Sequence, residues 1–402
     1  MVAYTNYRRD PRVRREAEAL VAKGHRVVFL ACRQPGEADR EQVAGVEVRK
    51  LPGIRHRRVS ASGYIVDYAI FFGLTMLHLL RHPARYDLVH VNNMPDFLVF
   101  AAWLPRLLGR PIIHDVHDLM PELYCEKFGI DERHWLVRIL QWQERRAGCF
   151  ASAVLTVEER LKSILVARGI PAAKISVLMN LPDERIFALR TAVPVRPAEA
   201  PVVVVYHGTL ARRLGLDLAL HALAQLCARG HRSSIEFRII GAGEERDALI
   251  ALTHELGLGE QVRFSEGFVP VERIPALIAD ADIGLVPLRV SAGTDIMLPT
   301  KLLEYVSSGI ACIAPRTETI GRYFDDDMIR FFEAGDVASL ADAIEQLARD
   351  PGMRVRLAAN ATHRFAERYR WSEHRNVYID LVAGLLESRP RSAFAAARED
   401  QR

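Results

Sequence analysis

Two successive series of short apolar segments, separated by helical patterns, run along this chain of 402 residues. Apolar runs of about 4–8 residues are typical of buried strands, whereas apolar residues that recur every three or four positions are typical of helices. Strand–helix–strand alternation predicts parallel sheets that are covered by helices. The expected strands are 1–5, 27–30, 86–91, 111–114, 153–156 and 175–178 in the first series, and 202–206, 235–240, 262–264, 283–286 and 310–314 in the second.

A segment rich in proline and alanine separates the two series. We therefore predict an α/β protein with two Rossmann-like, doubly wound domains. Ligands of such sheets bind beyond the carboxyl ends of the strands, so we expect the domains to face each other across a cleft. The predicted parts are an acceptor-binding domain over 1–185, a linker over 186–200, a nucleotide-sugar-binding domain over 201–365, a helix over 366–388 that crosses back to the first domain, and a disordered tail over 389–402.

Charge and cysteine content exclude several classes of protein. The formal net charge of +4 is too small to indicate nucleic-acid binding. The five cysteines are scattered and form no CxxC pair, which favours a reducing, cytoplasmic compartment and argues against structural zinc. Basic clusters at 8–15 and 55–58 could attract phosphates or an anionic membrane surface. The apolar stretch 65–80 is shorter than a membrane span, so we expect a buried helix or one at a membrane surface.

Two glycine-containing loops of the second series follow strands and precede helices. Gly208 and Thr209 belong to the first loop, where Arg212 or Arg213 could hold a phosphate. The second loop contains Gly241 and Gly243 and matches half of a dinucleotide fingerprint. The first loop could equally be a glycine turn with a surface arginine. The second loop could equally be a turn that holds an anion, and its incomplete fingerprint is weak support for NAD.

A third segment, 294–305, places a cation and a carboxylate one helical turn apart. Thr300 and Lys301 lie at the predicted start of a helix, where free amides and the helix dipole favour an anion. Glu304 follows one turn later and faces the same way as Lys301. This pair would suit the diphosphate and hydroxyl groups of a nucleotide sugar, although a surface ion pair would show the same spacing.

Two segments of the first series carry polar residues after strands. The sequence HDVHD at 114–118 could suggest a metal site, but no third ligand is evident, and we expect no metal. His117 or Asp118 could instead contact a reacting sugar. The segment 6–12, with Asp10 and Arg12, follows the first strand, and its charge suits an acceptor phosphate or a basic helix cap.

Taken together, these segments resemble the "group 1" family of retaining glycosyltransferases, which have the two-domain GT-B fold. The resemblance covers nearly the whole chain, and the order and spacing of its motifs make it specific. The motifs are 10–20, 90–96 and 117–122 in the first half, and 207–209 with Arg213, 241–244, 262–268 and 298–305 in the second.

The resemblance implies a role for each matching residue. Arg213 and Lys301 would bind the donor diphosphate and act with His117 and Asp118 in catalysis, and Glu304 would contact the ribose. The remaining residues implied for the donor are Gly208, Thr209, Gly241, Gly243, Gly267, Phe268, Val269, Asp295 and Thr300, and those for the acceptor are Asp10 and Arg12.

Two positions depart from the family pattern. Met297 stands where the family has the first glutamate of its E-x7-E motif, and Asp295 is a candidate to replace that sugar contact. Leu214 stands where a lysine is usual. Both departures leave the identity of the donor open.

The resemblance implies transfer of a sugar, with retention, from a nucleotide diphosphate sugar to a glycan or lipid-linked acceptor. The setting would be bacterial surface-polysaccharide biosynthesis, in the cytoplasm or at the inner face of the membrane, without nucleic acid as a partner. No cofactor or metal is expected, because Arg213 and Lys301 could neutralise the diphosphate. The alternatives are a nucleotide-sugar 2-epimerase on the same fold, an NAD-dependent oxidoreductase and a non-catalytic polysaccharide-assembly subunit.

Overall fold

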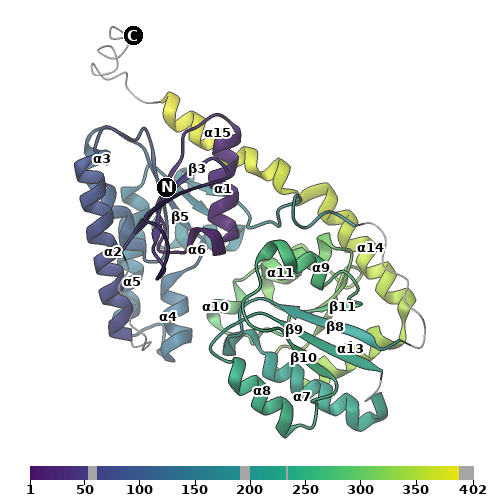
Figure 1. Ribbon diagram of the computed structural model, residues 1–402. Coiled ribbons are helices and arrows are strands. Elements are labelled where there is room, and N and C mark those ends of the chain that lie inside the picture. The colour runs from purple at the N-terminus through teal and green to yellow at the C-terminus, as the bar shows by residue number, and fades with distance from the viewer. Residues whose placement is uncertain (53–60, 191–199, 232–233, 389–402) are drawn as a thin grey trace. The chain divides into compact units, whose positions relative to one another are not determined.

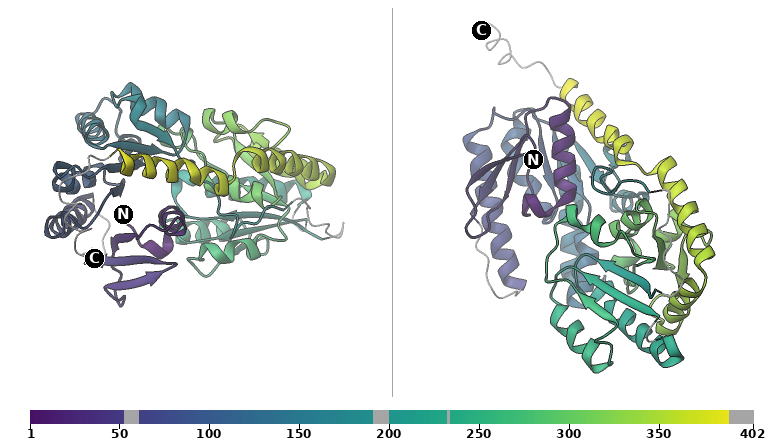
Figure 2. Two further views of the ribbon diagram at one scale, coloured as in Figure 1. Left: turned by 90° about the horizontal axis from the view of Figure 1, so that it is seen from above. Right: turned by 45° about the vertical axis from the view of Figure 1, so that its right-hand side comes forward.

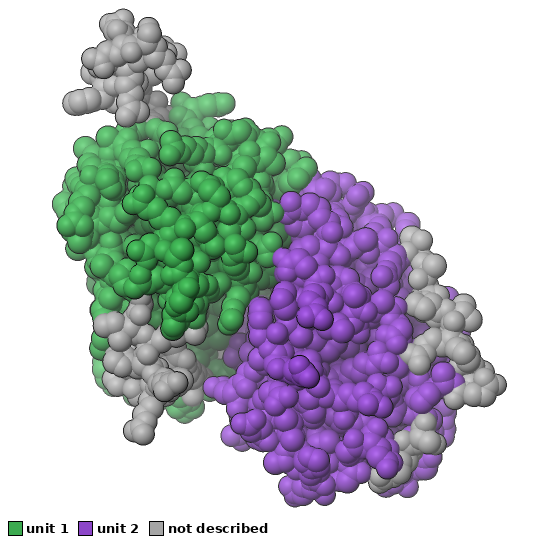
Figure 3. Space-filling model, in the orientation of Figure 1, with its two compact units in different colours: residues 1–179, 374–402 green, residues 180–373 purple. Residues whose placement is uncertain are grey.

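A computed structural model describes residues 1–52, 61–190, 200–231 and 234–388. The chain forms two compact units (Figures 1 and 3). Unit 1 contains residues 1–179 together with 374–402, and unit 2 contains residues 180–373. Most of the predicted linker, the predicted tail and the basic cluster 55–58 lie outside the described residues.

The sheet of unit 1 consists of two parts. One part has the order β1-β3-β2 and the other has the order β4-β5-β6-β7. All neighbouring strands are parallel except β2 and β3, which pair antiparallel at one edge (Figure 2, left). The strands are β1 (Val28–Cys32), β2 (Arg40–Val43), β3 (Val46–Leu51), β4 (Val89–Asn92), β5 (Ile112–Val116), β6 (Ala153–Thr156) and β7 (Ile175–Val177).

The first predicted strand, over 1–5, is wrong as a continuous strand. Only Val2 pairs in this segment, and it forms isolated parallel bridges to Leu30 of β1 and Val91 of β4. Backbone hydrogen bonds from Val2 and Ala3 fix the segment between these two strands. The short segment therefore joins the two parts of the sheet without forming a full ladder.

One set of helices in unit 1 packs on a single face of this sheet. Phe71 and Leu79 of α2, Leu98 of η2 and Ala147 of α5 share one buried cluster with residues of β1, β4 and β5. The helical elements of unit 1 are η1 (Tyr7–Arg9), α1 (Pro11–Ala22), α2 (Ala61–Arg81), η2 (Asp96–Ala102), α3 (Trp103–Leu107), α4 (Met120–Phe128), α5 (Trp135–Phe150), α6 (Glu159–Ala167), η3 (Ala172–Lys174) and α15 (Trp371–Glu387), whose first residues fall in unit 2. No helix in the described residues is both long and apolar enough to cross a membrane.

Unit 2 contains one parallel sheet of six strands in the order β10-β9-β8-β11-β12-β13. The chain builds outward from β8 to β10 and then returns to the other side of β8 with β11. The carboxyl end of β8 is therefore the topological switch point, where ligands of open α/β sheets bind. The strands are β8 (Val202–His207), β9 (Ile235–Ile240), β10 (Val262–Phe264), β11 (Ile283–Leu285), β12 (Ala311–Pro315) and β13 (Arg330–Phe332).

The helix predicted to start at Thr300 and Lys301 is present in unit 2 and begins at Thr300. The short helices over 292–295 and 318–323 and the long helix over 351–368 were not predicted. The elements are η4 (Arg212–Leu214), α7 (Leu216–Leu226), η5 (Cys227–His231), α8 (Arg246–Glu255), η6 (Val271–Arg273), α9 (Ile274–Leu277), α10 (Ala292–Asp295), α11 (Thr300–Ser307), α12 (Glu318–Tyr323), α13 (Val337–Arg349) and α14 (Pro351–Arg368).

Candidate active site

Three loops lie side by side at the carboxyl ends of β8, β9 and β10. The amide of Gly208 donates to the carbonyl of Ile240 at 2.9 Å, and the amide of Leu210 donates to the carbonyl of Ala242 at 2.9 Å. Ser265 then accepts from the amide of Gly241 at 2.9 Å and donates to the carbonyl of Gly267 at 3.1 Å. These bonds hold the glycine loops predicted from sequence together at the switch point.

Two glycines in these loops are required by close backbone contact. A β-carbon on Gly241 would lie 1.9 Å from the carbonyl oxygen of Gly208, and one on Gly243 would lie 2.1 Å from that of Leu210. Both distances are far below van der Waals contact. The packing of one loop on the other therefore accounts for both glycines, whether or not a ligand also approaches them.

We expect Gly243→Ala to lower the free energy of unfolding by about 1–3 kcal/mol, because the added methyl group overpacks a backbone contact. Chemical denaturation monitored by circular dichroism would measure the loss. Gly259→Ala is the matched control, since a β-carbon at that position would have no neighbour within 4 Å among the described residues. Equal effects of the two substitutions would contradict the packing explanation.

Lys301 lies beside the Gly208 loop and is buried. A β-carbon on Gly208 would meet its Nζ atom at 3.4 Å, and the same Nζ lies 3.7 Å from the centre of the Tyr206 ring. Burial lowers the pKa of Lys301 to about 7, an effect that Glu304 opposes and Arg213 reinforces. The site therefore contains an ammonium group that no described residue fully neutralises, and such a group would gain strongly from an anion.

Glu304 lies one turn after Lys301 and contacts the end of β8. Its Oε2 atom is 2.5 Å from Nε2 of His207. Tyr305 supports this pair, because its hydroxyl accepts from the amide of His207 at 3.0 Å and donates to the carbonyl of Val205 at 3.2 Å. Helix α11 thus brings the predicted cation and carboxylate to the same strand end.

The other predicted donor residues in unit 2 lie in the segments that follow β8 and β10 and at the start of α11. Arg213 is half-buried in η4, and its Nε atom has no hydrogen-bond partner among the described residues. Thr209 is exposed, and its carbonyl accepts from the Tyr206 hydroxyl at 2.6 Å. Thr300 is the first residue of α11. Gly267, Phe268 and Val269 follow β10, and the Phe268 side chain is exposed.

Asp295, the candidate substitute for the missing glutamate, forms a hydrogen bond to another residue of unit 2. It ends α10, and its Oδ1 atom accepts from the amide of Glu318 at 3.1 Å, at the start of α12. This carboxylate therefore has a structural partner already. The sugar contact of Asp295 remains a prediction.

His117 and Asp118 follow β5 in unit 1, and Asn93 holds their backbone. The Asn93 amide group donates to the carbonyl of Asp118 at 2.6 Å, and its Oδ1 accepts from the amide of His117 at 3.3 Å. Both side chains are half-buried, and Nδ1 of His117 has no hydrogen-bond partner among the described residues. The pair lies at the strand edge where ligands of such sheets bind.

Arg12 does not present a free charge, as the predicted acceptor contact would require. Its guanidinium is buried, and Nη2 donates to both carboxylate oxygens of Asp115, at 2.6 and 2.8 Å. Nε lies 3.4 Å from Glu16, one turn along α1. Asp10 caps the same helix by accepting from the amide of Val13 at 3.4 Å, and it is half-buried. The acceptor role of both residues remains a prediction, with Asp10 the more accessible.

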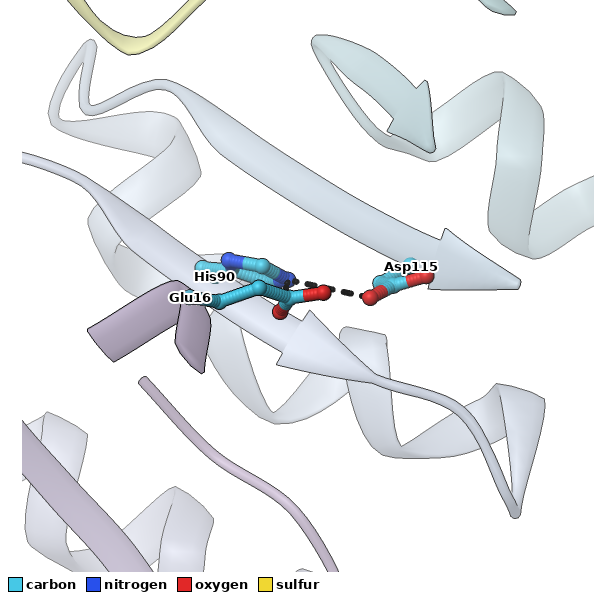
Figure 4. A group of neighbouring side chains, drawn as sticks. All are labelled: Glu16, His90 and Asp115. Carbon is cyan, nitrogen blue, oxygen red and sulfur yellow. Dashed lines mark ion pairs between the residues drawn. The ribbon is translucent and has the colours of Figure 1, made fainter. Parts of the chain in front are cut away.

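A buried group of Glu16, His90 and Asp115 has the composition of a metal site (Figure 4). Ligand atoms of the three lie within 4.8 Å of one another. The guanidinium of Arg12 already pairs with both carboxylates, and Nδ1 of His90 is 2.7 Å from the Tyr378 hydroxyl. The group fits an internal ion-pair network better than a metal centre. That no metal takes part in the reaction stays a prediction.

Sequence reasoning missed the residues that hold the predicted ones in place. Each comes from a distant part of the chain. Asn93 supports His117, and Asp115 supports Arg12. Tyr206 supports Lys301, and Tyr305 supports His207. Tyr206 and Tyr305 could have been found from the sequence, because each lies within or beside one of the motifs described above. Asp115 lies in the HDVHD segment, but nothing local indicates that its partner is an arginine near the N-terminus.

Profiles of two protein families match the two halves of the chain. The profile of the glycosyl transferase 4-like domain matches residues 10–180, and that of the glycosyl transferases of group 1 matches residues 192–364. The fold and these matches define a glycosyltransferase of the GT-B type, with two Rossmann-like domains. The chain belongs to the group 1 family of glycosyltransferases, and the predicted fold and resemblance are confirmed.

Individual relatives agree with this assignment. The α-D-kanosaminyltransferase of Streptomyces kanamyceticus is 25% identical over 391 residues, which are 89% of this chain and 94% of the relative. A lipopolysaccharide core biosynthesis glycosyltransferase of Rhizobium meliloti is 27% identical over 306 residues, or 76% and 78% of the two chains. The solved structure of the sucrose-phosphate synthase of Thermosynechococcus elongatus has a TM-score of 0.78 at 19% identity. The match covers 96% of this chain and 99% of the synthase chain.

Proposed function

We propose that this glycosyltransferase moves a hexose, with retention of anomeric configuration, from a nucleotide diphosphate sugar to a glycan or lipid-linked acceptor in surface-polysaccharide biosynthesis. The observation that carries the proposal is the placement of Lys301 and Glu304 on one turn of α11, beside Gly208 and the end of β8. The relationship to a lipopolysaccharide core enzyme supports the choice of pathway.

In this proposal, unit 2 binds the donor diphosphate. Lys301 and Arg213 supply positive charge, and the amides at the start of α11, from Thr300 onward, supply hydrogen bonds. The half-buried carboxylate of Glu304 binds ribose hydroxyls after exchanging its contact with His207. Each group is held by packing before the ligand arrives, which lowers the entropic cost of binding.

The same cations would assist bond cleavage. Negative charge grows on the diphosphate as the sugar leaves, and a buried ammonium stabilises the departing diphosphate more strongly than the intact donor, which carries less negative charge. The departing phosphate would accept the proton of the acceptor hydroxyl, and the new bond would form on the face from which the diphosphate leaves. His117 and Asp118 would contact the transferred sugar, and no metal ion would be needed.

A donor screen followed by analysis of the product tests the proposal. We expect one UDP-, GDP- or ADP-sugar to raise the unfolding temperature of the purified protein, and turnover with an acceptor to give a product with the donor's anomeric configuration in its NMR coupling constants. An inverted product would overturn retention. Release of free nucleotide without any acceptor would favour the epimerase, and donor binding without turnover would favour a non-catalytic subunit.

A further inference from the structure

The outward face of α5 combines aromatic and basic side chains. Its exposed residues recur at helical spacing and consist of Trp135, Arg138, Ile139, Trp142, Arg145, Arg146 and Cys149. The only acidic residue in α5, Glu144, is buried and paired with Arg168. A helix on the surface of a soluble protein normally shows mixed charges to water, so a face with two tryptophans and only positive charge is unusual.

Two further helices of the same layer expose apolar side chains. In α2 these are Ile65, Val66 and Leu77, and in α3 and directly after it they are Trp103, Leu107 and Leu108. The only acidic residue of α2, Asp67, accepts a hydrogen bond from Tyr4. Three of the four tryptophans of the chain are therefore exposed on these helices, although tryptophan is usually well buried.

These exposed side chains point away from the same face of one sheet. The inward sides of α2, η2 and α5 share one buried cluster, and α3 continues directly from η2. Aromatic contacts between Phe72 and Phe97 and between Phe100 and Phe150 place the η2 segment between α2 and α5. We call the outward surface of α2, α3 and α5 the tryptophan face.

We propose that the tryptophan face docks on an anionic lipid bilayer. Exposed tryptophans favour the membrane–water interface, where an apolar ring can enter the acyl boundary while its N–H stays hydrated. Arg138, Arg145 and Arg146 lie among the apolar side chains of α5 and complement anionic headgroups. Helices of this kind lie in the plane of the interface, which agrees with the absence of a spanning helix in the described residues.

The choice of a bilayer over a second protein rests on the sign of the charges. A self-complementary contact between two copies of this face would bring the three arginines of each copy together with no acidic residue of α5 to compensate them. An anionic bilayer supplies that compensation at every arginine. The inference is independent of the donor site, because it concerns only exposed residues of unit 1.

Co-sedimentation with vesicles tests the proposal. We expect the full chain to bind vesicles of phosphatidylglycerol and phosphatidylethanolamine, to bind pure phosphatidylcholine much more weakly, and to shift its tryptophan emission to shorter wavelength on binding. Replacing Arg138, Arg145 and Arg146 with glutamine should weaken binding on the order of a hundredfold, at about 1 kcal/mol for each basic residue near an anionic surface. The double variant Trp135→Ser/Trp142→Ser should also lose binding.

The variant Val355→Ser/Arg356→Gln is the matched control, since it removes an exposed apolar residue and a neighbouring arginine from α14 of unit 2. It should bind vesicles as the unaltered protein does, and circular dichroism would confirm that all variants fold. Equal binding by the tryptophan variant would overturn the proposal. So would a dimer in sedimentation velocity that the same tryptophan substitutions dissociate and that does not bind vesicles.

Discussion

Replacing Lys301 with methionine is expected to abolish the thermal stabilisation by the nucleotide sugar and to lower kcat/KM by about 10²–10³-fold, the usual effect of removing one group that stabilises developing charge. Methionine fills nearly the same space over the Tyr206 ring but carries no charge. The unfolding temperature without ligand should therefore change little, or rise, because a buried ammonium is removed. A thermal-shift assay with the nucleotide sugar and initial-rate kinetics would measure the two losses.

The low pKa of Lys301 adds a dependence on pH to this result. The diphosphate binds the protonated form, and in the free protein that form is lost as the pH rises through about 7. Donor affinity should be fully present below that pH and should fall by up to about tenfold for each pH unit above it. Lys301→Arg stays charged and should flatten this dependence. A pH dependence unchanged by that substitution would mean that another group titrates.

The second large effect concerns stability and lies in unit 1. Asp115→Ala is expected to lower the free energy of unfolding by about 3–5 kcal/mol, because it leaves the buried guanidinium of Arg12 without its main partner. Burial alone would raise the pKa of Asp115, but Arg12 outweighs it and holds that pKa far below its ordinary value. Denaturant titration followed by circular dichroism would measure the loss.

The double variant Arg12→Met/Asp115→Leu separates the charge pair from its packing. It removes both charges together and should be much less damaging than Asp115→Ala alone. The variant Arg12→Lys tests the acceptor role predicted from sequence. A changed KM for the acceptor without loss of stability would support that role. A stable Asp115→Ala protein would show that the ion pair contributes little.

Local patterns were sufficient to predict the architecture and part of the site. Strand and helix periodicity predicts the parallel sheets, because the apolar residues of each element mark the face that is buried. The spacing of Lys301 and Glu304 places both on one side of α11, because residues three apart on a helix are neighbours. The proximity of this pair to Gly208 follows from the order of strands around β8, which the structure shows and the sequence analysis did not predict.

Contacts between distant segments could not be predicted in this way. Arg12 and Asp115 are separated by 103 residues, and His207 and Glu304 by 97. The sequence shows Arg12 as one of several arginines in a basic segment, and only the fold distinguishes the buried Arg12 and Arg15 from the exposed Arg8 and Arg9. The glycines at 241 and 243 likewise resemble ligand loops, although the backbone of the neighbouring loop is sufficient to require them.

The division of the chain into units has a consequence for its biosynthesis. Unit 1 is assembled from both ends of the polypeptide, and Tyr378 of α15 completes the buried network at His90. Unit 2 is one continuous stretch, residues 180–373. During translation unit 2 can therefore finish folding first, while unit 1 waits for α15 to leave the ribosome. Nonsense mutations just before residue 374 should thus yield a chain whose N-terminal part is open and prone to aggregate.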